Sequence, residues 1–217
     1  MSKKPHKEKD MKKSISAQVR DSIVDDIFNS TYRPGQILTE RALIDAYGCS
    51  KTTVREALVT LCQEHILRNI PRYGYEVLRV ERSEITDILE FRYVLETGCL
   101  RRCFENITPR HILRLQELHR DCCERVSSQS LWEHWDTNAN FHLELILLAG
   151  NRYAYQQLKE ALDTLKRAYA QYYWDKPNLI ESASDMKNHE TLIAALRNRD
   201  LEAACSALGK DMKEFAY

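Results

Sequence analysis

The stretch Cys49–Leu58 gathers hydroxyl and cationic side chains at the start of a predicted helix. Ser50 can cap this helix, and four candidate contact residues follow on its first turns: Lys51, Thr52, Thr53 and Arg55. Backbone amides at a helix N-terminus attract anions, and side chains of these types bond to phosphate oxygens. An arginine can also bond to both acceptors on a guanine edge. The stretch therefore predicts a helix end that enters the major groove of DNA.

The segments before this helix have the order of a helix-turn-helix. Apolar spacing predicts a first helix over residues 16–29 and a short second helix from Thr39 to Tyr47. Gly48 ends the second helix, and the third is expected to run from Lys51 to about His65. A supporting helix followed by two short helices and a tight turn is the arrangement in which the last helix reads DNA.

Residues 66–80 predict a β-hairpin directly after the third helix. Two short strands bracket the tip Pro71–Gly74, where Arg72 supplies a positive charge and Gly74 permits close backbone approach. After a helix-turn-helix, such a hairpin indicates a wing whose arginine reaches the DNA backbone or the minor groove. The alternative is that the hairpin has a purely structural role and only packs within the fold.

Composition and charge are compatible with this interpretation. The chain has 217 residues, of which 43% are hydrophobic and 29% charged, and it has no apolar run long enough for a membrane span. The N-terminus lacks an apolar signal region, so we expect a cytoplasmic protein with no membrane partner. Residues 1–80 hold 14 lysines and arginines against 10 aspartates and glutamates, whereas the remainder holds 18 against 22. A basic module on an acidic body suits local binding of phosphates.

The predicted fold is mainly α and has three parts. Residues 1–13 form a disordered basic tail, residues 14–80 a winged helix-turn-helix with three helices and a two-stranded wing, and residues 81–217 an all-α bundle. Breaks at proline, glycine and asparagine predict six bundle helices: about 84–105, 108–127, 130–149, 152–174, 179–197 and 200–215. A bundle of this size can bury a core and still leave an interior cavity.

The cysteines are an odd set without a C-x-x-C pair: Cys49, Cys62, Cys99, Cys103, Cys122, Cys123 and Cys205. Most fall on apolar helical positions, which indicates reduced, buried thiols. Cys99 and Cys103 share a helix face, so the alternative to a packing role is that these two thiols act as a redox sensor.

Several runs carry a resemblance to a known family. Leu38–Ile44, Tyr47–Leu58 and Pro71–Tyr75 resemble the GntR family of bacterial transcription regulators over nearly the whole N-terminal domain. The second half resembles the all-helical FCD ligand-sensing domain of the FadR-type branch, in a shorter version with six helices. This second resemblance rests on the following residues: Glu90–Glu96, Asn140–His142, Ala149–Asn151, His189, Ala195 and Asp200.

The resemblance implies where DNA contacts come from. The matching positions are Arg41, Ser50, Lys51, Thr52, Arg55 and the wing tip Arg72–Gly74. Lys51 stands where the family usually has arginine. Lysine lacks the planar guanidinium fork, so its contact is expected to be weaker or to shift to a phosphate.

The resemblance also implies a ligand set in the bundle, from which this sequence departs. Metal-binding members use an Asp, a His four residues later and two further His. The matching positions here carry Asn138, His142, His189 and Asp211. Two imidazoles, one carboxylate and one amide oxygen can still hold a divalent ion of the Zn, Ni or Mn class. Two alternatives stay open: a polar pocket that binds an organic ligand directly, and plain structural packing.

Two further residues are candidates for ligand binding. Arg92 matches an arginine that faces the cavity in FCD domains, and a guanidinium suits a ligand carboxylate. Asn151 either caps a helix or lines the cavity.

The functional prediction is a ligand-responsive transcription regulator. We expect a homodimer that binds a palindromic double-stranded DNA operator, represses a metabolic operon and responds to a small carboxylate, with or without a metal ion. One alternative is a DNA-binding dimer whose bundle is only a dimerisation scaffold. Another is a metal-dependent enzyme using His142, His189 and Asp211. The chain lacks a motif such as H-E-x-x-H that would place a general base, so we expect no enzyme.

Overall fold

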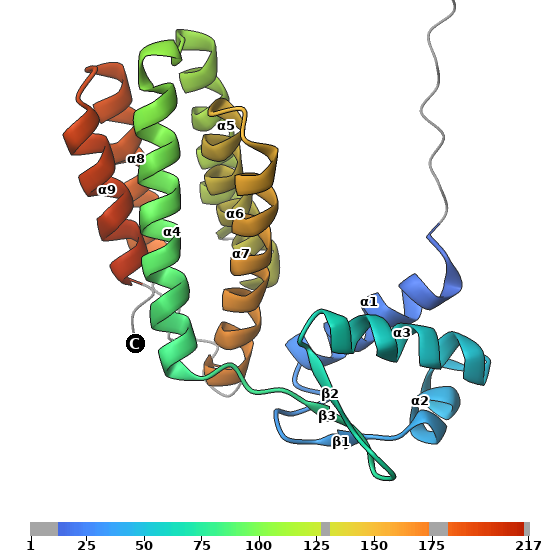
Figure 1. Ribbon diagram of the computed structural model, residues 1–217. Coiled ribbons are helices and arrows are strands. Elements are labelled where there is room, and N and C mark those ends of the chain that lie inside the picture. The colour runs from blue at the N-terminus through green and yellow to red at the C-terminus, as the bar shows by residue number, and fades with distance from the viewer. Residues whose placement is uncertain (1–12, 127–130, 174–181, 215–217) are drawn as a thin grey trace, which may run out of the picture. The chain divides into compact units, whose positions relative to one another are not determined.

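The computed structural model describes residues 13–126, 131–173 and 182–214 (Figure 1). Contacts divide the chain into two compact units, with the boundary between Arg79 and Val80. The tail predicted for residues 1–13 lies outside the described residues except for Lys13. Among the described residues, no helix combines the length and apolar character of a membrane span.

The first unit contains the three predicted helices: α1 (Ile15–Phe28), α2 (Glu40–Tyr47) and α3 (Lys51–Gln63). Ile23, Leu43 and Leu58, one from each helix, are buried in a shared hydrophobic core. Thr39 caps α2 by accepting a hydrogen bond from a backbone N–H, and Gly48 ends it in the left-handed conformation that glycine tolerates. The predicted helix-turn-helix order is confirmed.

The wing belongs to a sheet of three antiparallel strands in the order β1-β3-β2. The two predicted strands are present as β2 (Leu67–Ile70) and β3 (Gly74–Val77). The third, β1 (Ile37–Leu38), was not predicted, and it pairs with β3 so that Leu38 lies opposite Tyr75. A two-residue strand is too short to show an alternating pattern, which is why the sequence did not indicate it.

The pairing of β1 with β3 leaves no room for a side chain at Gly74. Its φ is +138°, and a Cβ at this position would lie 2.4 Å from the carbonyl oxygen of Leu38. We expect Gly74→Ala to lower the free energy of unfolding by at least about 2 kcal/mol, because the backbone must shift. Gly35 is the control: its φ is +82°, but an added Cβ meets nothing within 4 Å. Gly35→Ala should cost roughly 1 kcal/mol. Urea unfolding of the full chain measures both, and equal losses would argue against the clash.

The second unit is built from six α-helices in its described part, as predicted. Their bounds are α4 (Arg82–Cys103), α5 (Pro109–Val126), α6 (Leu131–Leu148), α7 (Arg152–Tyr173), α8 (Ser182–Arg197) and α9 (Leu201–Glu214). A short 3-10 turn, η1 (Phe104–Asn106), follows α4. Helix α4 packs against α6, α7 and α9, while α5 packs against α6 and α8. Three clusters of buried apolar side chains form the core of the described part of this bundle.

Val80, the first residue of the second unit, is held against α7. Its backbone N–H donates to Gln171 Oε1 at 2.9 Å, and its carbonyl oxygen accepts from the Tyr172 hydroxyl at 3.2 Å. The Val80 side chain is buried beside Leu165 and Ala168. The end of α7 therefore fixes the residue at which the chain leaves the bundle toward the first unit.

None of the seven cysteines, all of which lie in the described residues, forms a disulfide, and four of them are buried: Cys99, Cys103, Cys122 and Cys205. Burial raises the pKa of the Cys99, Cys103 and Cys205 thiols above the usual value. A raised pKa leaves less thiolate, so these thiols are poor nucleophiles and suit a packing role.

Candidate functional sites

The N-terminus of α3 is an ordered, exposed helix end. Ser50 Oγ accepts a hydrogen bond from the Thr53 N–H at 3.2 Å, and the two hydroxyl oxygens are 2.9 Å apart. Lys51 and Thr52 follow on the exposed side of the first turn. Capping leaves the remaining first-turn amides directed outward from the helix end, where an anion is favoured. The structure thus brings Ser50, Lys51, Thr52 and Thr53 together at one helix end.

Glu40 pairs with two of the cations predicted to contact DNA. Its Oε1 accepts from Arg55 Nε at 2.7 Å, and its Oε2 lies 3.9 Å from Lys51 Nζ. Arg55 and Lys51 remain more than half exposed, and such surface pairs are weak because water and salt screen them. A DNA phosphate can therefore replace Glu40 as the partner. The sequence did not point to Glu40, because this pairing joins two different helices.

The remaining predicted DNA-contact residues lie on α2 and on the wing. Arg41 is exposed on the first turn of α2, and Arg72 is exposed in the β2–β3 turn with a φ of +71°. Gly74 opens β3 behind that tip. Tyr73 is 73% exposed between them and was missed, although an exposed aromatic beside an arginine is a usable signal of a binding tip.

A cluster of buried polar side chains lies inside the second unit. His142 on α6, His189 on α8 and Asp211 on α9 supply three possible ligand atoms that all lie within 4.8 Å of one another. His142 Nε2 is 3.4 Å from His189 Nε2 and 3.0 Å from Asp211 Oδ2. His189 Nε2 is 3.7 Å from Asp211 Oδ1. Three helices thus bring together three of the four predicted ligand positions.

Helix α4 adds two partners behind His142. Glu96 Oε2 accepts from His142 Nδ1 at 2.7 Å, and Glu96 Oε1 accepts from Arg92 Nε at 3.0 Å. All of these side chains are at most 2% exposed. The sequence missed Glu96 as a site residue. Its signal was the four-residue spacing from Arg92, which also fits an ordinary surface ion pair.

Burial and the neighbouring charges change the pKa values of the ionisable groups in this cluster. Burial alone would lower the pKa of His142, but Glu96 and Asp211 outweigh it and raise the pKa to about 9. Burial lowers the pKa of His189 to about 3. Burial also opposes ionisation of Asp211, yet His142 holds the pKa of that carboxyl below its usual value. The structure therefore favours a charged His142 between two carboxylates and a neutral His189.

Asp211 fits the role of a cation ligand. Both of its carboxylate oxygens are buried without a hydrogen bond, although Oδ2 lies 3.0 Å from His142 Nε2. We interpret that contact as a charge pair whose geometry does not suit a hydrogen bond. Two atoms that bind one ion at about 2.1 Å lie about 3.0 to 3.4 Å apart, depending on coordination geometry. The two distances from His142 Nε2 fall in this range.

The surroundings of His189 are aromatic. The Phe141 ring stacks on the His189 ring with centroids 3.8 Å apart, and the His119 ring on α5 lies edge-on at 5.9 Å. His189 Nδ1 is buried without a hydrogen-bond partner. These contacts hold the imidazole in place and keep water from it. Neither Phe141 nor His119 was predicted from the sequence.

The other predicted ligand residues have different surroundings. Asn138 is buried on α6 one turn before His142, so the two share a helix face. Arg92 is buried, and its Nη2 has no hydrogen-bond partner. Asn151 Oδ1 accepts from the Ala154 N–H at 3.0 Å and so caps α7. Its described contacts do not include the cluster.

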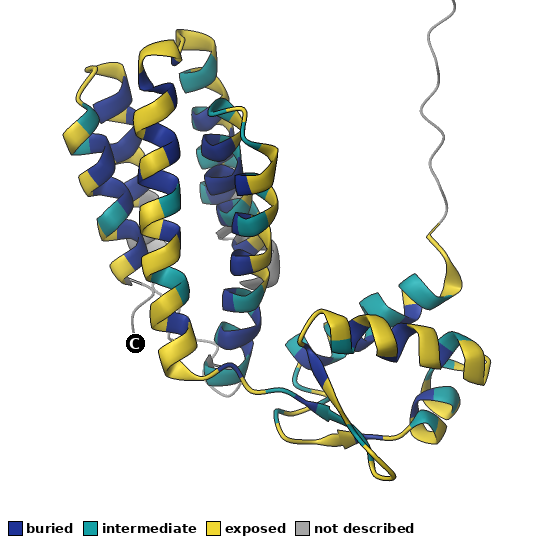
Figure 2. Ribbon diagram, viewed as in Figure 1, coloured by how far each residue is buried: buried dark blue, intermediate teal, exposed yellow. Residues whose placement is uncertain are grey.

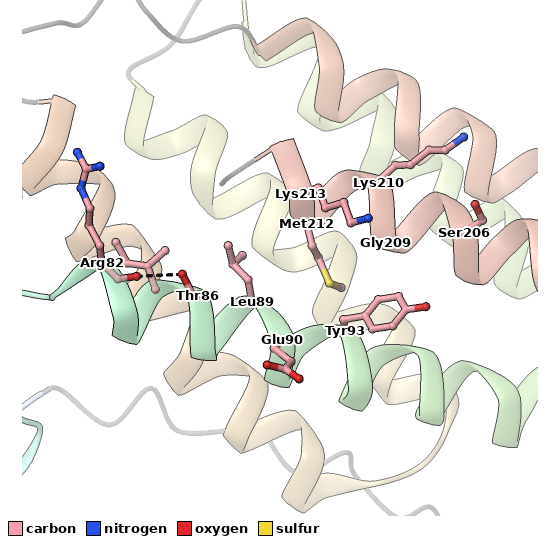
Figure 3. Close-up of a pocket in the computed structure, with 11 residues that line it drawn as sticks. Arg82, Thr86, Leu89, Glu90, Tyr93, Ser206, Gly209, Lys210, Met212 and Lys213 are labelled. Atoms are coloured by element: carbon pink, nitrogen blue, oxygen red, sulfur yellow. Dashed lines mark hydrogen bonds between the residues drawn. The ribbon is translucent and has the colours of Figure 1, made fainter. Parts of the chain in front are cut away.

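A separate groove of about 740 Å³ lies between α4 and α9 (Figure 3). Leu89, Tyr93 and Met212 lie along it, together with the cations Arg82, Lys210 and Lys213. None of the residues of the buried cluster lines this groove. The groove and the cluster are therefore two distinct features of the second unit.

Comparison with known proteins places each unit in a family. Residues 15–77 match the bacterial regulatory proteins of the gntR family, and residues 87–213 match the FCD domain. The HTH-type transcriptional regulator McbR of Escherichia coli (strain K12) is 26% identical over 93% of this chain and 90% of its own length. The HTH-type transcriptional repressor RspR of the same strain is 22% identical, over 93% of this chain and 87% of its own length.

Solved structures share the fold. E. coli McbR/YncC superposes with a TM-score of 0.73 at 24% identity, over 94% of this chain and 95% of that chain. The GntR protein of Rhodococcus sp. RHA1 superposes with a TM-score of 0.71 at 21% identity, over 92% and 94%. Both likenesses extend through the winged helix-turn-helix and the helical bundle.

Proposed function

Because this chain belongs to the gntR family of bacterial regulatory proteins and carries an FCD domain, as its sequence predicted, we propose that it is a metal-assisted, carboxylate-responsive repressor. It is a DNA-binding transcription regulator, and its relatives are named as regulators rather than enzymes. In the proposal it acts in the cytoplasm as a homodimer and binds a palindromic operator near a metabolic operon.

The observation that carries the proposal is the buried Asp211 carboxylate, whose two oxygens lack hydrogen bonds and face two histidines. A buried anion without such bonds is costly unless a cation balances it, and a divalent ion would take over that role from the protonated His142. His142, His189, Asp211 and, from the neighbouring turn, Asn138 would hold a divalent ion. His142 binds as the neutral imidazole, with its Nδ1–H donated to Glu96, which fixes the orientation of the ring.

Arg92 is the proposed second contact of the effector. A divalent ion held by these residues would supply a positive charge for a carboxylate oxygen of the effector. Arg92 keeps its Nε on Glu96 and has an unsatisfied Nη2, which can donate to a second oxygen of the same carboxylate. The cluster is closed in this state, since its side chains are at most 2% exposed. An organic effector therefore requires the surrounding helices to move, and that movement is what a sensor needs.

Movement of α7 offers a route from the bundle to the DNA-binding unit. Val80 is hydrogen-bonded to Gln171 and Tyr172 near the end of α7, so a displacement of this helix end displaces the start of the connection. An effector shifts DNA binding only if it binds the competent and incompetent states unequally. The movement of the surrounding helices that admits a carboxylate would supply such a difference.

One experiment tests the whole proposal. Metal-stripped full-length protein is titrated with Zn²⁺, Ni²⁺ or Mn²⁺ and then with small dicarboxylates, while thermal unfolding and binding to DNA from its own promoter region are followed. We expect stabilisation by a metal, further stabilisation by one class of carboxylate, and a changed operator affinity. Operator binding without any response to metals or carboxylates would favour the alternative in which the bundle only dimerises the protein.

The Glu40 pairings lead to a prediction about the free protein. We expect Glu40→Gln to raise affinity for non-operator DNA several-fold at low salt, because it removes a carboxylate that competes with phosphates for Arg55 and Lys51. Fluorescence anisotropy over a salt series measures this effect. Glu76→Gln is the control, because Glu76 neutralises the exposed Arg68 on the sheet in the same way. An equal gain in both variants would indicate a change in overall charge rather than release of Arg55.

A further inference from the structure

A thiol, an imidazole and a carboxylate meet where α5 packs against α8, outside the buried cluster of His142, His189 and Asp211. His119 and Cys123 lie four residues apart on α5 and so share a helix face. Cys123 Sγ lies 3.5 Å from His119 Nε2. Glu190 Oε1, on α8, lies 3.6 Å from the same nitrogen. We call Cys123, His119 and Glu190 the outer cluster.

The distances in the outer cluster suit an ion of the zinc class. Nitrogen at about 2.1 Å and sulfur at about 2.3 Å from a tetrahedral zinc ion lie about 3.6 Å apart, and nitrogen and oxygen ligands lie about 3.4 Å apart. The observed separations of 3.5 Å and 3.6 Å are close to these values. The Glu190 side chain is 70% exposed, so it can turn to complete the ligand set.

The charges of the outer cluster would also balance such an ion. A thiolate and a carboxylate together neutralise a divalent cation, and the proton of the Cys123 thiol leaves to solvent when the metal binds. Sulfur and imidazole ligands favour zinc and related ions over manganese or magnesium, which prefer oxygen. The outer cluster therefore differs in chemistry from the buried cluster, whose proposed ligand atoms are nitrogen and oxygen.

The outer cluster reaches from the surface of the second unit to the buried cluster. Glu190 is exposed, whereas His189, the residue before it on α8, is 1% exposed. Buried ribbon of this unit faces the interior of the bundle, and exposed ribbon lies on its outer faces (Figure 2). The His119 side chain is 12% exposed, and its ring lies edge-on to the His189 ring with centroids 5.9 Å apart. His119 thus contacts an exposed carboxylate and a buried ligand position.

We propose that the outer cluster is a second metal site, which binds a divalent ion of the zinc class at the surface and passes it to His189. This inference rests on the metal site of the proposed function and adds a route to it. The buried cluster needs such a route, because its side chains are at most 2% exposed. His189 can receive the ion because its Nδ1 has no hydrogen-bond partner and its Nε2 faces His142 and Asp211.

Co²⁺ in place of zinc tests the outer cluster, because a bond between cobalt and a thiolate absorbs strongly in the near ultraviolet. Metal-stripped full-length protein is mixed with less than one equivalent of Co²⁺. We expect this absorption to appear and then fade as the ion moves to nitrogen and oxygen ligands. It should be lost in Cys123→Ser and should persist in Asp211→Asn, which keeps the outer cluster. Cys62→Ser is the matched control, since Cys62 is also half-buried but lies on α3, and it should behave as the wild type.

The rate of metal uptake tests the transfer. The protein is mixed with Zn²⁺, a chelator is added after increasing delays, and the melting temperature is measured. We expect Cys123→Ser to slow the gain in stability at least about tenfold and to leave its final size unchanged, because the buried ligands are intact. Metal stabilisation without any thiolate absorption, or with an unchanged rate in Cys123→Ser, would overturn the outer cluster alone. Absorption that never fades in the wild type would overturn the transfer and would also argue against the buried metal site.

Discussion

Arg55→Ala is expected to reduce operator affinity by about thirtyfold or more. The wild-type guanidinium lies on the second turn of α3, more than half exposed and paired with Glu40. A paired contact of arginine with guanine contributes about 1 to 3 kcal/mol, and the proposed homodimer would lose two of them. The thermal stability of the protein should hardly change, because exposed ion pairs contribute little to it. Fluorescence anisotropy with the operator at fixed salt measures the loss.

The control for Arg55→Ala is another paired arginine of the same unit. Arg20 on α1 donates to Glu64 and Asp21, so Arg20→Ala removes the same charge from the supporting helix. It should keep its preference for operator over unrelated DNA. If Arg55→Ala binds with unchanged sequence preference, α3 is not the recognition helix. If both variants lose affinity equally, the effect of Arg55 is one of overall charge.

The first unit was predictable because its determinants are local. Thr39, Gly48 and Ser50 are capping residues that act within four positions of their own place in the chain, and each ends or begins a helix in the structure as predicted. The short strand at Ile37 and Leu38 was not predictable in this way, since it exists only through pairing with β3. The pairing of Glu40 with Arg55 also depends on how two helices pack, which no local pattern indicates.

The buried cluster shows a similar division. Periodicity predicted the helices that carry His142, His189 and Asp211, but it did not say that these helices meet at those residues. These three residues were predicted as ligands because of the family resemblance. That they lie close together is observed in the structure. Glu96 could not be selected, because Arg92 and Glu96 have the spacing of a common solvated ion pair. Only the near-complete burial of both distinguishes them, and burial of a polar pair depends on tertiary packing.

Asp211→Asn is expected to abolish most of the stabilisation that a divalent metal gives the protein. At a metal concentration about a hundredfold above the dissociation constant, a bound ion stabilises the wild type by about 2.7 kcal/mol. For a chain of this length, that corresponds to a rise in the melting temperature of roughly 5 to 10 °C. Loss of a ligand should weaken binding at least about a hundredfold, which leaves about 0.4 kcal/mol and a rise of roughly 1 °C.

Two companion variants decide whether Asp211 acts as a ligand or only balances charge. Glu96→Gln keeps all ligand atoms but weakens the acceptor for His142 Nδ1–H, so metal affinity should fall about ten- to a hundredfold rather than vanish. Glu105→Gln removes an exposed carboxylate of η1 and should keep the full metal response. If Asp211→Asn retains the wild-type rise in melting temperature, the ion does not bind at this cluster. Direct binding of a carboxylate would then be the better account of its buried charges.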